Sequence, residues 1–278
     1  MPKAHKPSTG HWTPLTPEKN GLSSLASRLR GVSEWVFPPT CARQGVLTDA
    51  VDLSAEEVAA LSVPGDEGES LCPQCLAPMP AEVGRICGRC LQTSPPFEQT
   101  LAAFRYEGTA KAFVQALKYG PDLSYGQVMA QLWRRRLTEM AAQAEACTAG
   151  PIYLIPVPLH PQRLRQRGFN QSLELAKLLC QIGSDSPFVW CRDWVRRRHD
   201  TPSQAGLSAK ARQTNLKRAF ALTAAGERQL AGLEGGTVVL LDDVMTTGST
   251  LFHLGRVCRR ANADIPLQSW VFARANPP

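Results

Sequence analysis

The sequence contains no apolar run near the roughly 18 residues that a membrane-spanning helix requires, so we expect no membrane span. Its N-terminal stretch lacks the order of a charged segment followed by an apolar segment that marks a secretory signal. The motif GxxxxGK[ST], which holds nucleotide phosphates in P-loop proteins, occurs nowhere in the chain. We therefore expect a cytoplasmic protein that does not use a P-loop.

Positive charge is missing from residues 44 to 84, which contain acidic side chains but no lysine or arginine. The whole chain nevertheless carries a formal net charge of +7, because its arginines gather in later segments. Such a charge favours anionic partners such as phosphates, pyrophosphate or nucleic acid. The acidic segment argues against a nucleic-acid surface in its own part of the chain. Hydrophobic residues make up 43% of the sequence, which is enough for a packed core.

Three regions follow from the changes in composition along the 278 residues. Residues 1–36 read as a flexible tail with a short amphipathic helix, residues 37–93 as a zinc ribbon with an acidic insert, and residues 94–278 as an α/β domain. In this last region we expect strands at 101–106, 152–158, 188–195, 238–241 and 267–273, and helices at 109–118, 169–182 and 251–262. Parallel strands alternating with helices define the expected fold class.

Four cysteines form two CxxC pairs, Cys72 with Cys75 and Cys87 with Cys90. Two such pairs bring four thiolates into a tetrahedron around one zinc ion. A segment this short has little core of its own, so a structural zinc would supply its folding energy. Disulfides are the competing interpretation, and they fit poorly with a cytoplasmic chain. Cys41 stands alone, since Gln44 occupies the position where a third CxxC would need its partner.

The most informative segment is VVLLDDVMTTGST, from Val238 to Thr250. Its aliphatic start predicts a strand buried on both faces of a parallel sheet, with Asp242 and Asp243 at its C-terminal end. Ligands bind at this edge of such sheets. The loop Thr246, Thr247, Gly248, Ser249 and Thr250 precedes a helix, and its N–H groups suit an anion. The carboxylates suit hydroxyls or a bound cation, so the pair of features describes a ribose 5-phosphate. An ordinary buried strand with a polar turn is the alternative.

Three arginines alternate in the segment that follows Pro158, at Arg163, Arg165 and Arg167. We expect a basic loop here, because planar guanidinium groups bind the oxygens of a pyrophosphate in pairs. The alternative is a basic loop that only faces solvent. If the arginines do bind a diphosphate, the ligand is phosphoribosyl pyrophosphate (PRPP) rather than a simple sugar phosphate.

The segment 238–250 resembles the binding signature of phosphoribosyltransferases, and the whole set of motifs resembles the ComF/GntX family. The set comprises the CxxC pairs, LKYG at 117–120, IPVPLHPQRLRQRGFNQ at 155–171, TPxQ at 201–204, RxxN at 212–215 and VVLLDDVMTTGST. The resemblance implies an N-terminal zinc ribbon on a phosphoribosyltransferase type I-like parallel sheet with a small hood. It also implies binding of PRPP with Mg²⁺, and a role in natural competence or in DNA uptake and utilisation.

Two functions remain open on this resemblance. In the first, the protein is an enzyme that transfers phosphoribose from PRPP to an acceptor, with Asp242 and Asp243 as the candidate catalytic residues. Thr246 argues against a purine acceptor, because purine-salvage relatives carry an aspartate there. In the second, the protein is a non-catalytic adaptor that binds PRPP or nucleotide ends, and single-stranded DNA beside components of the DNA-uptake machinery. Trp133, Trp190 and Trp194 are then the candidates for stacking on bases.

Overall fold

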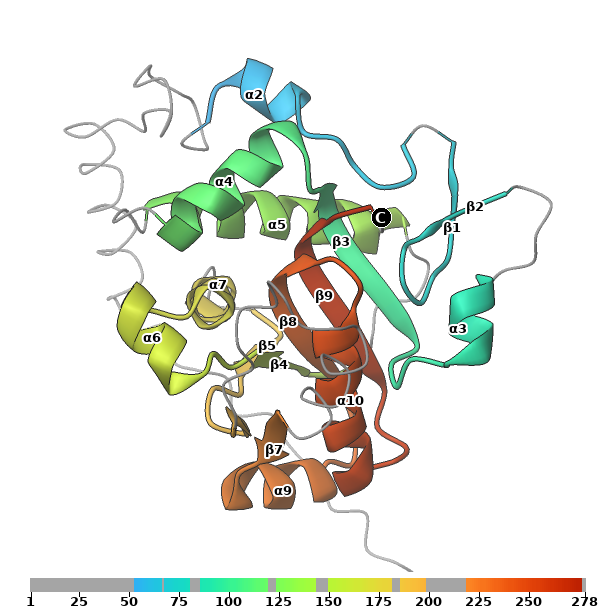
Figure 1. The fold of residues 1–278 in the computed structure, drawn as a ribbon, viewed down its shortest axis with the longest axis vertical. Coiled ribbons are helices and arrows are strands. Elements are labelled where there is room, and N and C mark those ends of the chain that lie inside the picture. The colour runs from blue at the N-terminus through green and yellow to red at the C-terminus, as the bar shows by residue number, and fades with distance from the viewer. Residues whose placement is uncertain are drawn as a thin grey trace, which may run out of the picture. The chain divides into compact units, whose positions relative to one another are not determined.

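The computed structural model describes residues 53–66, 68–80, 86–119, 124–143, 150–181, 186–198 and 219–276 (Figure 1). The expected tail and first amphipathic helix, Cys41, and the motifs at 201–204 and 212–215 lie outside the described residues. The predicted boundaries between the tail, the ribbon region and the α/β domain stay predictions.

Five strands form one parallel sheet in the order β3-β9-β8-β4-β5. They are β3 (Gln99–Arg105), β4 (Ile152–Pro156), β5 (Phe188–Trp190), β8 (Thr237–Met245) and β9 (Leu267–Arg274). The central strand β8 pairs with β4 only as far as Leu241, opposite Pro156, but its pairing with β9 continues to Met245, opposite Arg274. Both aspartates therefore lie where β8 has run past its β4 neighbour.

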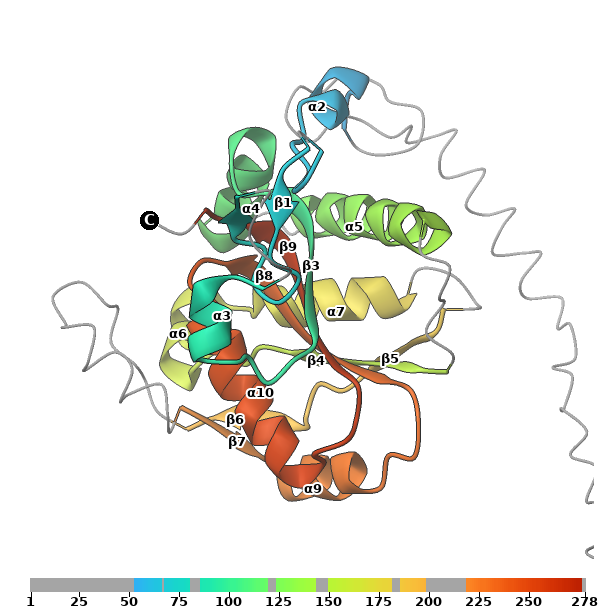
Figure 2. The same ribbon diagram turned by 90° about the vertical axis from the view of Figure 1, so that its right-hand side faces the viewer.

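Alternate residues of β8 serve the two faces of the sheet. Val239 and Leu241 lie in an apolar cluster with Trp133 of α5 (Ser124–Gln143). The helices α4 (Gly108–Tyr119) and α7 (Gln171–Gln181) add their apolar residues to the same face. Val238 and Leu240 point the other way and join the cluster of α10 (Ser249–Ala261). Figure 2 shows α10 on one side of the strands and α5 and α7 on the other. Burial on both faces explains the continuous aliphatic run.

The cysteine-rich segment forms a small ribbon of its own. Its elements are the antiparallel strands β1 (Ser70–Leu71) and β2 (Pro78–Met79), followed by α3 (Gly88–Gln92). Three of the four cysteines are buried, and they belong to the same apolar cluster as the core residues of α10. The ribbon region of the chain thus packs onto the sheet's α10 face.

The acidic insert contributes to the fold through its described part. Ser54 caps the short helix α2 (Ala55–Ala59), and its side chain accepts a hydrogen bond from the Glu57 amide at 3.3 Å. Leu53 is buried in the cluster of α4 and α5. Glu69 forms an ion pair with Arg105 at the end of β3. Some of the acidic residues therefore have structural partners within the chain.

A second small sheet forms the hood. It pairs β6 (Val195–Arg197) with β7 (Phe220–Leu222) in antiparallel fashion, and α9 (Ala224–Ala231) follows. The expectation of a single strand over 188–195 is wrong, because the segment divides into β5 and β6. The amide of Cys191 still donates to the Leu154 carbonyl, and the chain then turns away from the parallel sheet.

Among the described residues of the α/β domain, the helices α5, α6 (Pro161–Arg167) and α9 were not expected from the sequence. The strands β3, β4 and β9 and the helices α4, α7 and α10 begin and end close to the expected residues, whereas β8 runs on to Met245 and β7 was not expected. Within the described part of the chain, no helix has the length and apolarity to cross a membrane.

Candidate functional site

The paired aspartates of β8 are held by different partners. Asp242 Oδ1 accepts hydrogen bonds from the Ser172 hydroxyl at 2.8 Å and from the Asp243 amide at 3.0 Å. Asp243 is buried, and its Oδ2 lies 2.6 Å from the ammonium of Lys118 at the end of α4. Both hydrogen bonds that Asp242 accepts from the described residues end on Oδ1. Its Oδ2 is therefore available to a ligand hydroxyl.

Burial and neighbouring charges shift the pKa values of Asp242 and Lys118. Desolvation of the carboxyl, with the neighbouring charge of Asp243, raises the pKa of Asp242 to about 7. Burial alone would lower the pKa of Lys118, but the charges of Asp243 and Asp242 outweigh it and raise that pKa. Lys118 therefore stays a cation, and it compensates the charge of one carboxylate.

The loop after β8 has the geometry of an anion-binding turn. Gly248 adopts a left-handed conformation with φ of 76° and precedes the first turn of α10. A Cβ atom at this position would lie 2.5 Å from Met245 Cε, and the positive φ itself favours glycine because other residues rarely adopt it. Thr247 and Ser249 pair through their hydroxyls at 2.9 Å. The loop therefore offers hydroxyl groups and a helix N-terminus at the end of the acid-bearing strand.

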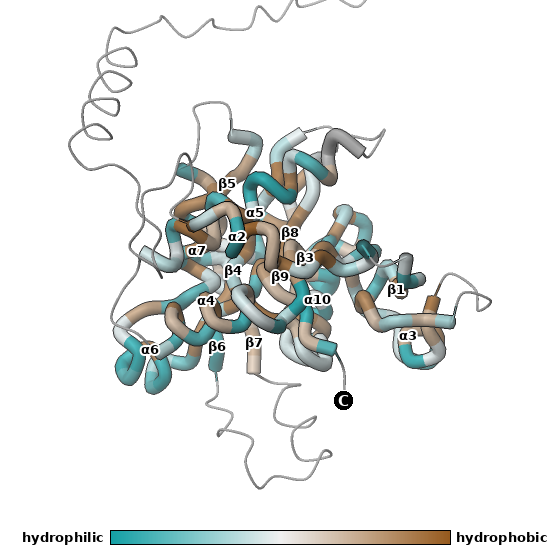
Figure 3. The backbone as a smooth tube through the Cα atoms, turned by 90° about the horizontal axis from the view of Figure 1, so that it is seen from above, coloured by the Kyte–Doolittle hydropathy of each residue, from teal (hydrophilic) through white to brown (hydrophobic). Residues whose placement is uncertain are grey.

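The structure corrects the expectation of a basic loop after Pro158, since Arg163, Arg165 and Arg167 lie on the helix α6. His160 caps this helix, its Nδ1 accepting from the Gln162 amide at 3.3 Å, and Gly168 ends it in a left-handed conformation. Arg163 and Arg167 are one turn apart and half-buried, whereas Arg165 is exposed. The alternation in sequence therefore does not align three arginines, because helical periodicity separates Arg165 from the other two. Hydrophilic colours mark parts of α6 in Figure 3.

The start of α7 connects the arginine helix with the aspartates. Asn170 is buried, donates to the Val157 carbonyl at 3.0 Å and accepts from the Ser172 amide at 3.2 Å. Ser172 in turn donates to Asp242. Arg167 donates to Gln171 at 3.3 Å. Asn170 and Gln171 belong to the FNQ end of the motif at 155–171, but nothing in the sequence identified Ser172 or Lys118 as partners of the aspartates.

The four cysteines come together as the CxxC spacing predicts. All four sulfur atoms lie within 4.8 Å of one another, and Cys75 Sγ and Cys87 Sγ are 3.6 Å apart. Thiolates bound to zinc at about 2.3 Å in a tetrahedron are about 3.8 Å apart, so the cluster fits one zinc ion. Burial raises the pKa of Cys75 and of Cys90, which favours protonated thiols when no metal is bound. The residues present therefore fit a structural Cys₄ metal centre.

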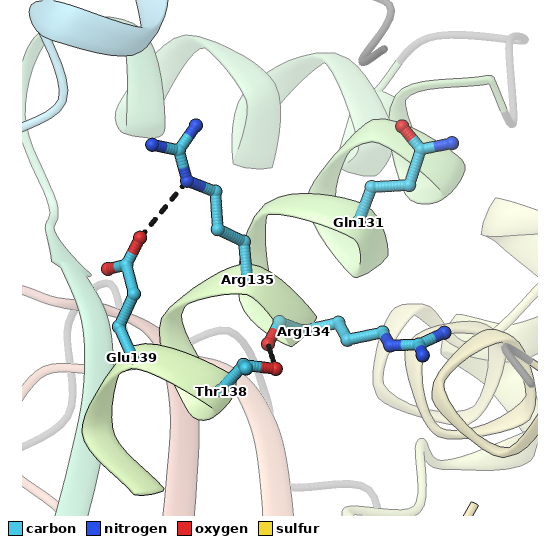
Figure 4. A pocket seen from close by; sticks show the side chains of 5 residues that line it. All are labelled: Gln131, Arg134, Arg135, Thr138 and Glu139. Carbon is cyan, nitrogen blue, oxygen red and sulfur yellow. Dashed lines mark hydrogen bonds and ion pairs between the residues drawn. The ribbon is translucent and has the colours of Figure 1, made fainter. Parts of the chain in front are cut away.

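A separate hollow lies on the surface of α5, away from the aspartates and the loop. Its lining residues are Gln131, Arg134, Arg135, Thr138 and Glu139 (Figure 4). Arg135 pairs with Glu139 at 3.0 Å, and the Thr138 hydroxyl donates to the Arg134 carbonyl at 3.1 Å. Because these residues come from one helix and bond to one another, we assign no function to this hollow.

The tryptophans considered for base stacking have structural surroundings. Trp133 is 1% exposed and packs edge-on against Phe272 in the core. Trp194 stacks on Tyr153 at a centroid distance of 5.7 Å. Trp190 is half-buried, with the Arg192 guanidinium over its ring. Trp133 is therefore removed from the candidates for a nucleic-acid contact.

The fold and the site together define the class of protein. A parallel sheet flanked by helices carries the acid pair on its central strand and the turn at Gly248 directly after that strand, with a small hood and a Cys₄ ribbon. This is a phosphoribosyltransferase type I-like α/β domain with a zinc ribbon preceding it.

Comparison with known proteins leads to the family. No family model matches the chain. The chain is 35% identical to the DNA utilization protein YhgH of Salmonella typhimurium over 206 residues, which cover 74% of this chain and 84% of the relative. It is 32% identical to YhgH of Escherichia coli K12 over 208 residues, 74% of this chain and 85% of the relative. Competence protein F of Haemophilus influenzae is 31% identical over 189 residues, 68% of this chain and 78% of the relative. The chain belongs to the ComF/GntX family.

Proposed function

We propose that this protein binds PRPP together with Mg²⁺ and transfers its phosphoribosyl group to an acceptor, as one step in the use of DNA. The relatives' names, DNA utilization protein and competence protein F, support the setting of DNA uptake and utilisation. The site supports the ligand, because two carboxylates near the end of β8 are followed within a few residues by a loop that can bind an anion.

The observation that carries this proposal is the arrangement at the end of β8. Asp242 and Asp243 are fixed by Ser172 and Lys118, and the loop around Gly248 follows directly. Two carboxylates accept hydrogen bonds from the vicinal hydroxyls of a ribose, and the loop N–H groups bind its 5′-phosphate. A ligand with both groups at this spacing is a ribose 5-phosphate.

Mg²⁺ fits this site as a partner of the ligand rather than as a resident ion. The described residues bring only two carboxylates together here, and Mg²⁺ is commonly held by one or two carboxylates plus substrate phosphates. Bound Mg²⁺ would neutralise charge on the diphosphate. Asp242 and Asp243 would hold the ribose side of the complex, and no further protein ligand is required.

The proposed reaction is a displacement at C1 of the ribose. A lone pair of the acceptor forms the new bond to C1, the bond from C1 to the diphosphate oxygen breaks, and pyrophosphate leaves with that electron pair. The acceptor's proton passes to solvent. Negative charge grows on the departing diphosphate, and the guanidinium groups of Arg163 and Arg167 on α6 would stabilise it. Thr246 cannot take up a proton, so the acceptor is one that needs no base at this position.

A screen for pyrophosphate release tests the enzymatic part. The zinc-loaded protein is incubated with Mg²⁺–PRPP and with bases, nucleotides or single-stranded DNA. We expect release above the rate of PRPP hydrolysis with one acceptor class, and no such release from Asp242→Asn/Asp243→Asn. The matched control is the exposed carboxylate variant Asp264→Asn, which should retain the wild-type rate.

Binding of Mg²⁺–PRPP without release for every acceptor class would contradict catalysis and favour the adaptor. Among the described residues, the burial of Trp133 removes one of the three base-stacking candidates on which the adaptor function depends. A titration with single-stranded DNA at two salt concentrations separates the enzyme from the adaptor further. An adaptor that binds DNA phosphates loses affinity for DNA steeply as the salt concentration rises. Release of pyrophosphate only when DNA is present would mean that DNA is the acceptor, so that one site both binds DNA and transfers the phosphoribosyl group.

A further inference from the structure

The first cysteine pair is built into the edge of the sheet through three consecutive carbonyl groups. The Pro73 carbonyl accepts from the Thr100 amide at 2.8 Å, and the Gln74 carbonyl accepts from the Thr100 hydroxyl at 2.7 Å. The Cys75 carbonyl accepts from Arg274 Nε at 2.8 Å. A segment with three such bonds cannot move independently of the strands beneath it. The metal centre therefore has a fixed position relative to β3 and β9.

Arg274 carries this connection on to the anion loop. It lies at the end of β9 and is 3% exposed. Besides the Cys75 carbonyl, it donates from Nη1 to the carbonyls of Met245 at 3.1 Å and Thr246 at 2.7 Å. One guanidinium thus holds a metal-binding knuckle of the ribbon and the first residues of the anion loop.

Arg89 makes a second, independent connection. It lies between Cys87 and Cys90 in the other cysteine pair, and its Nη2 donates to the Thr247 carbonyl at 2.8 Å. Arg89 and Thr247 are 158 positions apart in the sequence. Both cysteine pairs are therefore bonded to the loop, each through one arginine.

The charges at this junction favour an anion. Among the described residues, the hydrogen-bond partners of Arg274 are carbonyl oxygens and include no carboxylate. The two guanidinium groups donate to the adjacent carbonyls of Thr246 and Thr247, so two positive charges meet at the start of the loop. A buried charge is costly unless a negative charge compensates it. A phosphate group in the loop would supply that charge.

We propose that the ribbon's metal centre and the anion loop form one coupled site, in which zinc binding and phosphate binding each strengthen the other. Arg274 and Arg89 are the positioning residues that transmit the effect. The ligand class is a phosphate monoester, here the 5′-phosphate of PRPP, so this inference rests on the proposed function. It adds that metal binding in the ribbon controls the affinity of the loop for this phosphate. Coupling between binding sites is reciprocal, so each ligand must change the affinity for the other by the same factor.

The test measures zinc affinity by equilibrium competition with a zinc-selective chelator, with and without saturating Mg²⁺–PRPP. Calorimetry on the zinc-loaded full chain gives the affinity for Mg²⁺–PRPP, and circular dichroism reports whether the sheet stays folded as zinc leaves. We expect Mg²⁺–PRPP to raise the zinc affinity of the wild-type protein roughly tenfold.

Arg89→Gln is the informative variant because Arg89 is exposed, so its replacement leaves the core intact. We expect it to weaken Mg²⁺–PRPP binding several-fold and to reduce the effect of PRPP on zinc affinity. Arg89→Lys, which keeps the charge, should recover part of both. Arg260→Gln removes an exposed arginine from the last turn of α10 and is the matched control, expected to leave both values unchanged.

The outcomes separate this inference from the proposed function. Wild-type protein that binds Mg²⁺–PRPP but shows the same zinc affinity with and without it would overturn the coupling and leave the proposed function standing. An equal response in wild type and Arg89→Gln would overturn the role of Arg89. Zinc-loaded wild-type protein that fails to bind Mg²⁺–PRPP would overturn the proposed function and the inference together.

Discussion

The segments that leave the sheet after β8 and after β4 are held in different ways. After β8, arginine side chains bind three consecutive loop carbonyls, those of Met245, Thr246 and Thr247, and Gly248 closes the turn. After β4, the helix α6 contains no buried residue, and its arginines are half-buried or exposed. One segment is held at its backbone by arginine side chains from other elements, whereas the other is a short helix with no buried residue, in which Arg167 bonds to Gln171 of the next helix. We infer that the 5′-phosphate end of the ligand meets a preorganised site and the diphosphate end an adaptable one.

The largest effect is expected when the fixed loop is strained. Gly248→Ala places a Cβ atom 2.5 Å from Met245 Cε, at a φ of 76° that alanine rarely adopts. The end of the Met245 side chain can shift to relieve the contact, but the strain of the positive φ can be relieved only by a change in the loop backbone, so we expect roughly 100-fold weaker binding of Mg²⁺–PRPP in calorimetry.

Gly235→Ala is the control for this change, since nothing lies within 4 Å of a Cβ atom there. Wild-type affinity in Gly248→Ala would show that the loop is as adaptable as α6, and the contrast between the two segments would fail.

Much of the fixed region could be predicted from the sequence, and the reason is burial. The aliphatic start of β8 and the glycine that follows the two aspartates predicted a buried strand and a turn into a helix, and both are present. The strand continues past the aspartates to Met245, and Ser249 and Thr250 already lie in α10. The CxxC pairs likewise predicted the cluster of sulfur atoms. Both patterns express local constraints that do not depend on the rest of the chain.

The parts that escaped prediction depend on distant partners or on weak patterns. The helix α6 buries no residue, so it has no apolar periodicity to reveal it. Lys118, Arg274 and Arg89 reach the site from α4, β9 and the ribbon, and only the folded chain shows these contacts. The strand expected over 188–195 was wrong because the chain leaves the parallel sheet after Cys191 to form the hood.

A second prediction concerns the charge on Asp242. Its pKa of about 7 in the folded protein is above the ordinary value of 3.8, so the folded state retains a proton that the unfolded chain has lost between these values. The free energy of unfolding therefore falls as the pH rises from about 4 to about 7. Asp242→Asn removes the carboxyl that causes this fall in the free energy of unfolding. We expect the variant to be more stable than the wild type, without ligand, by about 2 kcal/mol at pH 8 and by almost nothing at pH 4.

Denaturant unfolding at the two pH values measures this difference, with the exposed Asp264→Asn as the control. An equal gain at both pH values would show that the carboxyl of Asp242 is not desolvated. The same protonation predicts that Mg²⁺–PRPP binds less tightly below pH 7, because a protonated carboxyl accepts hydroxyl protons poorly.

A smaller effect is expected within α6. Arg163 and Arg167 share one half-buried face, so Arg163→Gln should weaken binding of Mg²⁺–PRPP roughly tenfold through the loss of a charge-assisted contact. Arg165→Gln removes the same charge from an exposed position and should change the affinity less than twofold. Calorimetry of the two variants side by side decides between a face-specific contact and a general effect of positive charge. Equal losses in the two would favour the general effect.

The central claim is that the end of β8 binds the ribose and the phosphate of PRPP. Its most direct test is a calorimetric titration of zinc-loaded protein with Mg²⁺–PRPP, in the wild type and in Asp242→Asn/Asp243→Asn. We expect saturable binding to the wild type and no measurable binding to the double variant, because the ribose hydroxyls lose both charged acceptors. Undiminished binding by the folded double variant would contradict it.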